Sequence, residues 1–93
     1  MTTRISTQEQ QRARTETVNA QLDCKGLLCP LPIYRTAQAM SKLKGGEVLR
    51  IECTDPGSLA DFPAFARQRG HALVSAEEHN GVQVFHLRKG EVP

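Results

Sequence analysis

Three cysteines are the side chains of this chain best suited to covalent chemistry. Cys24 and Cys29 lie within the stretch LDCKGLLCPLP, residues 22–32, and Cys53 follows later. Cys29 is followed at once by the tripeptide Pro-Leu-Pro, so a thiol stands directly before a pair of prolines. The odd number of cysteines, with no hydrophobic secretion segment after a basic start, argues against a disulfide scaffold and predicts reduced thiols.

The proline pair predicts that a helix begins at Pro30 and that Cys29 is its capping residue. Proline is favoured at the first helical position because its fixed φ suits the helix and its missing N–H would be unpaired anyway. Pro32 still lies in the first turn, where no intrahelical donor is lost. The amide of Leu31 then points toward the cap, and the positive end of the helix lowers the thiol pKa from its usual ~8.5.

Local charge is more informative than the net charge of +2, which names no class of partner. Between residues 24 and 46 there is no Asp or Glu, whereas four basic residues fall in this segment: Lys25, Arg35, Lys42 and Lys44. We therefore expect an acid-free, cationic surrounding for Cys29. Lys42 and Lys44 fit equally well as charges that complement the C-terminus of a helix.

Several familiar thiol and metal chemistries lack the residues they need. A hydrolytic cysteine needs a positioned base, and surface or edge positions fit all three histidines better: His71, His79 and His86. A thioredoxin-type dithiol needs a second cysteine where Pro32 stands. The C-x4-C spacing of Cys24 and Cys29 matches no common zinc site, so we expect neither a metal nor a cofactor. A rigidly presented thiol remains, suited to exchange with sulfur electrophiles.

The other two cysteines receive different interpretations. Cys53 shares a strand face with Leu49 and Ile51, which predicts a small buried hydrophobe. Cys24 ends the first predicted strand and is either a core or edge residue or a second thiol that discharges or protects Cys29. Both interpretations of Cys24 stay open at this point.

The elements that position Cys29 can be predicted from periodicity. Residues 21–24 read as a short strand, and the apolar residues after Pro30 recur at helical spacing until Gly45-Gly46 ends that helix: Ile33, Ala37, Met40 and Leu43. Residues 47–54 alternate as a strand, and DPGS at 55–58 is typical of a turn that leads into a second helix.

The second half of the chain has equally clear signals. Ser58 is a plausible N-cap, Asp61 lies in the first turn, and the apolar face contains Leu59, Phe62, Phe65 and Ala66. Pro63 is expected to divide this helix into two short pieces, and Gly70 closes it. Residues 71–78 and 82–89 read as strands joined by the hairpin turn Asn80-Gly81.

The predicted fold is an α+β two-layer sandwich of order β-α-β-α-β-β. Right-handed crossovers place both helices on one face of a four-stranded mixed sheet. Residues 1–20 are predicted to form a polar, flexible arm, and residues 21–93 the folded domain. No apolar run approaches the ~18 residues of a membrane span, and we expect a cytoplasmic protein.

The chain resembles the TusA (SirA-like) sulfur-carrier family. The resemblance rests on LDCKGLLCPLP, on the Gly-Glu before the second strand, and on TDPGSLADFPAFARQRGHAL. It runs from about Leu22 to Lys89, and the family signature Cys-Pro-x-Pro at the start of the first helix corresponds to residues 29–32. The resemblance implies the same sandwich fold. The turn at 55–58 looks more like that of members from sulfur oxidisers.

The resemblance also implies a function. Cys29 would accept sulfane sulfur as a persulfide and act as a sulfurtransferase shuttle. The donor would be a cysteine desulfurase or a rhodanese-like protein, and the acceptor a DsrE-like protein or a thiolation enzyme, in tRNA thiolation, cofactor sulfuration or dissimilatory sulfur oxidation. By proximity to Cys29, the expected docking residues are Leu31, Tyr34, Arg35, Lys25 and Asp55. An equally good interpretation is that Tyr34 covers the sheet and that Arg35 faces solvent.

Two other functions compete with the persulfide carrier. One is a thiol-disulfide redox protein that uses Cys24 and Cys29. The other is a non-catalytic regulatory module that binds RNA or protein. Only four aromatic residues occur, and the basic residues are scattered, so no base-stacking platform is visible and direct nucleic-acid binding is not expected.

Overall fold

The computed structural model describes residues 17–91. Six elements follow one another in the predicted order: β1 (Ala20–Cys24), α1 (Leu31–Ser41), β2 (Val48–Cys53), α2 (Ser58–Arg69), β3 (Ala72–His79) and β4 (Val82–Arg88). Most of the predicted arm, residues 1–16, lies outside the described residues, so the division at residue 20 stays a prediction.

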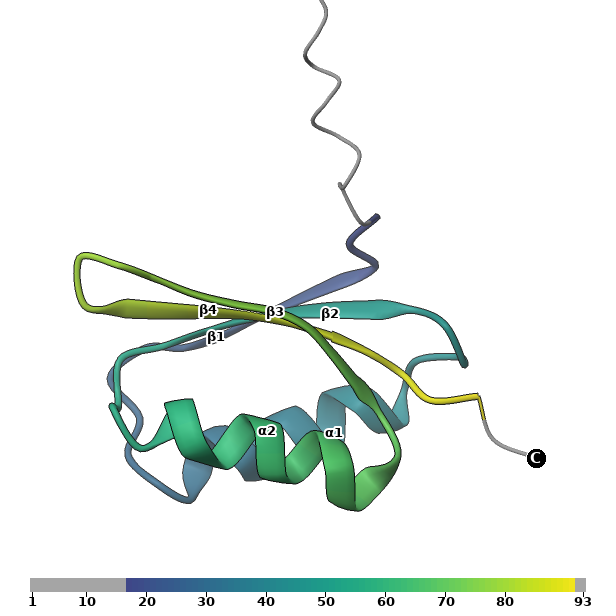
Figure 1. Ribbon diagram of the computed structural model, residues 1–93, viewed down its shortest axis with the longest axis horizontal. Helices are drawn as coiled ribbons and strands as arrows, with labels where there is room; N and C mark the ends of the chain where they lie inside the picture. The colour runs from purple at the N-terminus through teal and green to yellow at the C-terminus, as the bar shows by residue number, and fades with distance from the viewer. Residues whose placement is uncertain (1–16, 92–93) are drawn as a thin grey trace, which may run out of the picture.

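The sheet is mixed, as predicted. Its strand order is β1-β2-β4-β3, with β1 parallel to β2 and with β4 antiparallel to both of its neighbours. Both helices lie on the same face of the sheet, which confirms the two-layer α+β sandwich (Figure 1). The hairpin between β3 and β4 turns at Asn80 and Gly81, where φ is 53° and 84° respectively, as a tight two-residue turn requires.

The core lies between the helices and the two central strands. Leu49 and Ile51 of β2 pair with Leu87 and Phe85 of β4, and all four side chains are buried. The ring of Phe62 on α2 stacks on Phe85, with 4.4 Å between ring centroids. Because strand residues alternate between faces, these positions share the side of the sheet that the helices cover.

Helix α2 corrects one prediction. It runs unbroken from Ser58 to Arg69 with Pro63 inside it, so the expected division into two pieces is wrong. Pro63 removes only the hydrogen bond that would reach back to the carbonyl of Leu59, and Leu59 is exposed, so water can satisfy that group. The burial of Phe62 and Phe65 in the core holds both sides of the proline in one helix.

The helix ends also differ in detail from the predictions. Gly57 is the N-cap of α2 and Ser58 is its first residue, with Asp61 in the first turn and Gly70 as a left-handed C-cap. Helix α1 ends at Ser41, before the glycine pair, and Gly46 turns the chain into β2 with φ of 88°. The glycines therefore serve the turn after the helix rather than the end of the helix.

The topology gives the molecule two distinct ends. The β1–α1 and β2–α2 loops, with the N-termini of both helices, lie together on the left of Figure 1. The C-termini of both helices and the last residues of β4 lie at the opposite end, on the right. Cys29 belongs to the first of these ends.

Candidate functional site around Cys29

Cys29 lies exposed in the loop between β1 and α1. The N-cap of α1 is Pro30, so Cys29 precedes the cap by one residue, and its predicted role as the capping residue is wrong. The amide of Leu31 donates to the carbonyl oxygen of Leu28 at 2.9 Å rather than pointing toward the thiol. The proline pair shapes the helix start, since Pro32 is buried within the first turn of the helix, but it leaves Cys29 outside that turn.

A carboxylate from the neighbouring loop holds the backbone at Cys29. The amide of Cys29 donates to Oδ2 of Asp55 at 2.9 Å, and the amide of Gly57 donates to Oδ1 of the same side chain at 3.1 Å. The carbonyl oxygen of Asp55 accepts from the amide of Ser58 at 2.9 Å. Asp55 therefore links the thiol loop to the start of α2, a positioning role that differs from the docking role expected from the sequence.

Two further contacts join the same pair of loops. The amide of Gly26 donates to Oγ1 of Thr54 at 2.9 Å, and Gly26 itself has φ of 82°, a conformation that favours glycine. Nζ of Lys25 donates to Oε1 of Glu52 at 2.7 Å. The loop that presents Cys29 is thus attached along its length to the end of β2 and the loop after it.

The electrostatic surroundings of Cys29 reverse the prediction. The pKa of the Cys29 thiol is raised, chiefly because the thiol hydrogen-bonds to Asp61, and also by partial desolvation and the negative charges of Asp61 and Asp55. The segment around Cys29 contains no acid in sequence, but the β2–α2 loop and the first turn of α2 bring two acids to it in space. The expected acid-free surrounding and lowered pKa are both wrong.

Three of the four basic residues of that segment either pair with an acid or lie far from Cys29. Lys25 pairs with Glu52, whose pKa is lowered by this lysine and by Arg50. Lys42 and Lys44 follow the end of α1 and therefore lie at the opposite end of that helix from the thiol. Closeness in sequence did not predict closeness in space here, because the eleven-residue helix α1 separates these two lysines from the thiol.

An exposed apolar surface adjoins the thiol. Four large hydrophobic side chains at the start of the two helices are exposed: Leu28 (70%), Leu31 (46%), Tyr34 (63%) and Leu59 (49%). We call these four residues the apolar rim. Leu31 and Tyr34 were expected near the thiol, whereas Leu28 was not singled out. Leu59 was expected on the apolar face of the second helix, but its side chain is exposed. Arg35 is exposed as well.

The two other cysteines lie together in the core. Cys24 and Cys53 occupy facing positions of the parallel strands β1 and β2, and both are fully buried. Burial raises the pKa of both thiols, that of Cys53 to about 11. All three cysteines are free thiols. The prediction that Cys53 is a buried hydrophobe is confirmed, and Cys24 has Cys53 rather than Cys29 as its hydrogen-bond partner.

The histidines have partners on other parts of the fold. His79 contacts Oε1 of Glu77 at 3.0 Å in the exposed hairpin, and Nδ1 of His86 lies 2.9 Å from Oγ of Ser75. His71 accepts a hydrogen bond from the amide of Gly90. Within residues 17–91 no group of three metal-ligating side chains comes together, and no helix of that part is long and apolar enough to span a bilayer.

Comparisons with known proteins agree with one another. The sequence profile of the family described as sulfurtransferase TusA matches residues 20–89. The chain is 48% identical over 69 residues to the putative sulfur carrier protein YrkF of Bacillus subtilis, covering 74% of this chain but only 37% of that longer protein. It is 44% identical over 69 residues to the sulfur carrier protein TusA of Allochromatium vinosum, covering 74% of this chain and 91% of that one.

A solved structure gives the same result for the fold. The crystal structure of the SirA-like protein from Desulfitobacterium hafniense superposes with a TM-score of 0.68 at 26% sequence identity. The match covers 77% of this chain and 99% of that one. The matched part therefore amounts to a complete SirA-like fold.

Proposed function

Because this chain belongs to the TusA family, we propose that it carries sulfane sulfur as a persulfide on Cys29 and relays it from a donor protein to an acceptor protein. The observation that carries this proposal is the contrast among the thiols. Cys29 is exposed on a loop that backbone hydrogen bonds fix in place, whereas Cys24 and Cys53 are buried. Only Cys29 can reach the sulfur of another protein.

The transfer requires no oxidant or cofactor. The sulfur of Cys29 attacks the terminal sulfur of a donor persulfide, the S–S bond of the donor breaks, and the donor leaves as a thiolate. The proton of Cys29 moves to the donor thiolate, so a thiol and a persulfide exchange roles with no net redox change. In delivery the acceptor thiol attacks the terminal sulfur of Cys29–S–SH in the same way.

Asp61 is the group placed to handle that proton. It accepts the hydrogen bond of the Cys29 thiol and, together with Asp55, raises the pKa of that thiol. The unloaded carrier therefore rests as a protonated thiol, which is a weaker nucleophile than the thiolate. As Cys29 attacks, Asp61 receives the proton and passes it on to the departing donor sulfur. A persulfide is more acidic than a thiol, so the loaded form ionises more readily beside the same acids.

The apolar rim is the docking face in this proposal. Exposed Leu28, Leu31, Tyr34 and Leu59 surround the N-termini of the two helices next to the thiol. Tyrosine is enriched among residues that dominate interface energy, and apolar groups at the centre of a contact exclude water. The donor would be a cysteine desulfurase or a rhodanese-like protein. The acceptor would be a DsrE-like protein or a thiolation enzyme, and three reduced thiols fit a reducing compartment such as the cytoplasm.

The decisive experiment is intact-mass measurement after loading. The reduced protein is incubated with a persulfide donor such as a rhodanese and thiosulfate, and then weighed. We expect one added sulfur atom on the wild type, on Cys24→Ala and on Cys53→Ala, and none on Cys29→Ala. Loading that persists in Cys29→Ala would overturn the assignment.

The same variants test the redox alternative. In the structure Cys24 is enclosed beside Cys53, so a Cys24–Cys29 disulfide would require Cys24 to leave the core. We therefore expect mild oxidation to leave the mass of the unloaded protein unchanged. A loss of two protons that Cys24→Ala abolishes would favour the redox function instead.

A further inference from the structure

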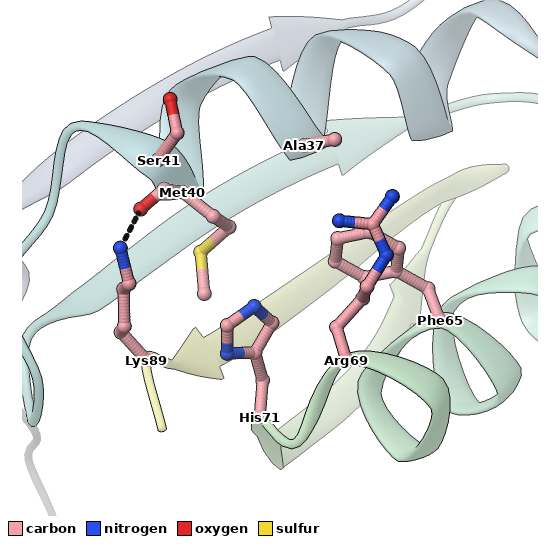
Figure 2. Close-up of a pocket in the computed structure, with 7 residues that line it drawn as sticks. All are labelled: Ala37, Met40, Ser41, Phe65, Arg69, His71 and Lys89. Atoms are coloured by element: carbon pink, nitrogen blue, oxygen red, sulfur yellow. Dashed lines mark hydrogen bonds between the residues drawn. The ribbon is translucent and has the colours of Figure 1, made fainter. Parts of the chain in front are cut away.

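A cavity of about 250 Å³ lies between the C-terminal halves of the two helices, far along α1 from Cys29. Figure 2 shows the side chains of Met40 and His71 directed into this space, with Arg69 over Phe65 at one side and the amine of Lys89 turned to the carbonyl of Met40 at the other. We call it the basic pocket, and its lining residues are Ala37, Met40, Ser41, Phe65, Arg69, His71 and Lys89. It belongs to neither the thiol site nor the apolar rim.

The pocket collects positive groups without acidic partners. Arg69 ends α2, His71 precedes β3 and Lys89 follows β4, so three separate segments each contribute one basic side chain. Within residues 17–91, no ion pair joins Arg69 or Lys89 to a carboxylate. The pKa of His71 is lowered by burial and, to a smaller extent, by the charges of Lys89 and Arg69.

Within residues 17–91, Lys89 and His71 each keep an N–H group that has no acceptor. Nζ of Lys89 donates at 2.8 Å to the carbonyl oxygens of Met40 and Leu43, which uses two of its three N–H groups. Nδ1 of His71 accepts from the amide of Gly90 at 3.0 Å, so in the neutral ring Nε2 carries the hydrogen. Figure 2 shows the His71 ring directed into the space between the helices.

The other polar side chains of the pocket, Arg69 and Ser41, also act as hydrogen-bond donors. The guanidinium of Arg69 lies over the ring of Phe65, 5.5 Å from its centroid, a stacking that holds the group while its in-plane donors stay available. The hydroxyl of Ser41 donates to the carbonyl oxygen of Gln38. Free donors and positive charge select an anionic acceptor.

The size and the apolar lining of the pocket narrow the class of ligand. Ala37, Met40 and Phe65 form its apolar side, where a carbon skeleton can replace water. About 250 Å³ is below the ~300–1,000 Å³ typical of pockets for drug-sized ligands. We propose that the basic pocket binds a small organic carboxylate, with the carboxylate on Arg69 and His71, Lys89 adding positive charge at the other side, and the carbon skeleton against Ala37 and Met40.

Benzoate is a suitable probe, with benzamide as its neutral isostere and inorganic phosphate as an anion without a carbon skeleton. Each is titrated at constant ionic strength into the full chain, and NMR follows the methyl group of Met40 and the ring of His71. We expect saturable shifts with benzoate, and binding at least about tenfold weaker with benzamide and with phosphate. Equal binding of benzamide would refute the anion site, and equal binding of phosphate would refute the role of the apolar side.

A matched pair of variants locates the site. Arg69→Gln removes a pocket cation, and we expect it to weaken benzoate binding about tenfold. Arg67→Gln removes a cation from the same last turn of α2 but outside the pocket, and should bind as the wild type does. Unchanged binding in Arg69→Gln, or an equal loss in both variants, would overturn the proposal.

Two readouts separate this proposal from persulfide transfer. Bound carboxylate should raise the pKa of His71, whose charged neighbours are Arg69 of α2 and Lys89 after β4, while the facing part of α1 supplies the uncharged Met40 and Ser41. Sulfur loading of Cys29 should be the same in Arg69→Gln and in the wild type. An unchanged His71 titration with saturating benzoate would contradict the proposed contact, whatever the result at Cys29.

Discussion

The two ends of the helical layer carry side chains of opposite charge, acids at the helix N-termini and bases at the C-termini. At the thiol end, Asp55 accepts from the amides of Cys29 and Gly57, and Asp61 lies in the first turn of α2. At the other end, Lys89 donates to the carbonyl oxygen of Met40 in the last turn of α1 and to that of Leu43 just after the helix, and Arg69 lies in the last turn of α2. Acids at helix N-termini and bases at C-termini are the arrangement that the helix dipole favours.

The two ends differ in how their charges affect neighbouring side chains. The carboxylates at the helix starts also raise the pKa of the Cys29 thiol, which favours its protonated form. Within residues 17–91, Lys89 is bonded to backbone carbonyl oxygens and Arg69 lies over an aromatic ring, and no carboxylate pairs with either cation. One end thus raises the pKa of a thiol with carboxylates, whereas the other lowers the pKa of His71 with cations.

The largest expected effect is a loss of stability when Lys89 is replaced. Lys89→Met keeps the aliphatic length but removes two partly buried hydrogen bonds, one to the carbonyl of Met40 in α1 and one to that of Leu43 just after it. Since hydrogen bonds to charged groups are worth ~1.5–3 kcal/mol, we expect a loss of about 2 kcal/mol in the free energy of unfolding. Urea denaturation measures this loss. Lys42→Met is the control, because Lys42 is exposed, and its stability should stay within ~0.5 kcal/mol of the wild type.

The next effect concerns the reactivity of the thiol. Asp61→Asn removes the negative charge and the strong acceptor that raise the pKa of Cys29, so the thiolate fraction at neutral pH should rise. We expect the iodoacetamide reaction of Cys29 to become severalfold faster at pH 7.5 and to reach its plateau at lower pH. The fold itself should change little.

The control for this prediction is Glu78→Gln, which removes one carboxylate from β3. It should leave the pH profile of alkylation unchanged. A profile for Asp61→Asn that coincides with that of the wild type would show that Asp61 does not govern the thiol proton.

The smallest expected effect is a pH dependence of stability from His71. The folded pKa of His71 lies below its unfolded value of ~6.5 because of burial and nearby cations. The neutral ring is therefore favoured in the native state, and its contribution is fully present above ~6.5 and is lost as pH falls toward the folded pKa. Between pH 7.5 and 5.5, the wild type should lose more stability than His71→Gln, in which residue 71 no longer titrates.

His79→Gln provides the comparison, because His79 lies in the exposed hairpin away from the basic pocket. It should lose as much stability on acidification as the wild type does. Saturating benzoate should reduce the loss in the wild type, and an equal pH dependence in His71→Gln and the wild type would contradict the assignment.

The fold was largely predictable because its signals are local. The helical spacing of Ala37 and Met40, the alternation of Leu49 and Ile51, and the turn at Asn80-Gly81 each depend on neighbours within a few residues. The prediction that Pro63 divides the second helix was wrong for the same reason. The local tendency of this proline to break a helix is outweighed by the burial of Phe62 and Phe65, which depends on strands far along the chain.

The sequence by itself determined the order of the elements, the family and the choice of Cys29 as the candidate thiol, which the structure shows to be exposed. These follow from short-range patterns and from one motif of four residues, Cys-Pro-Leu-Pro. Only the tertiary structure decided the electrostatics, because Asp55 and Asp61 reach Cys29, and Lys89 reaches α1, across gaps in sequence that the packing of loops and strands closes. Coulomb interactions depend on distance in space, and spacing along the chain does not report that distance.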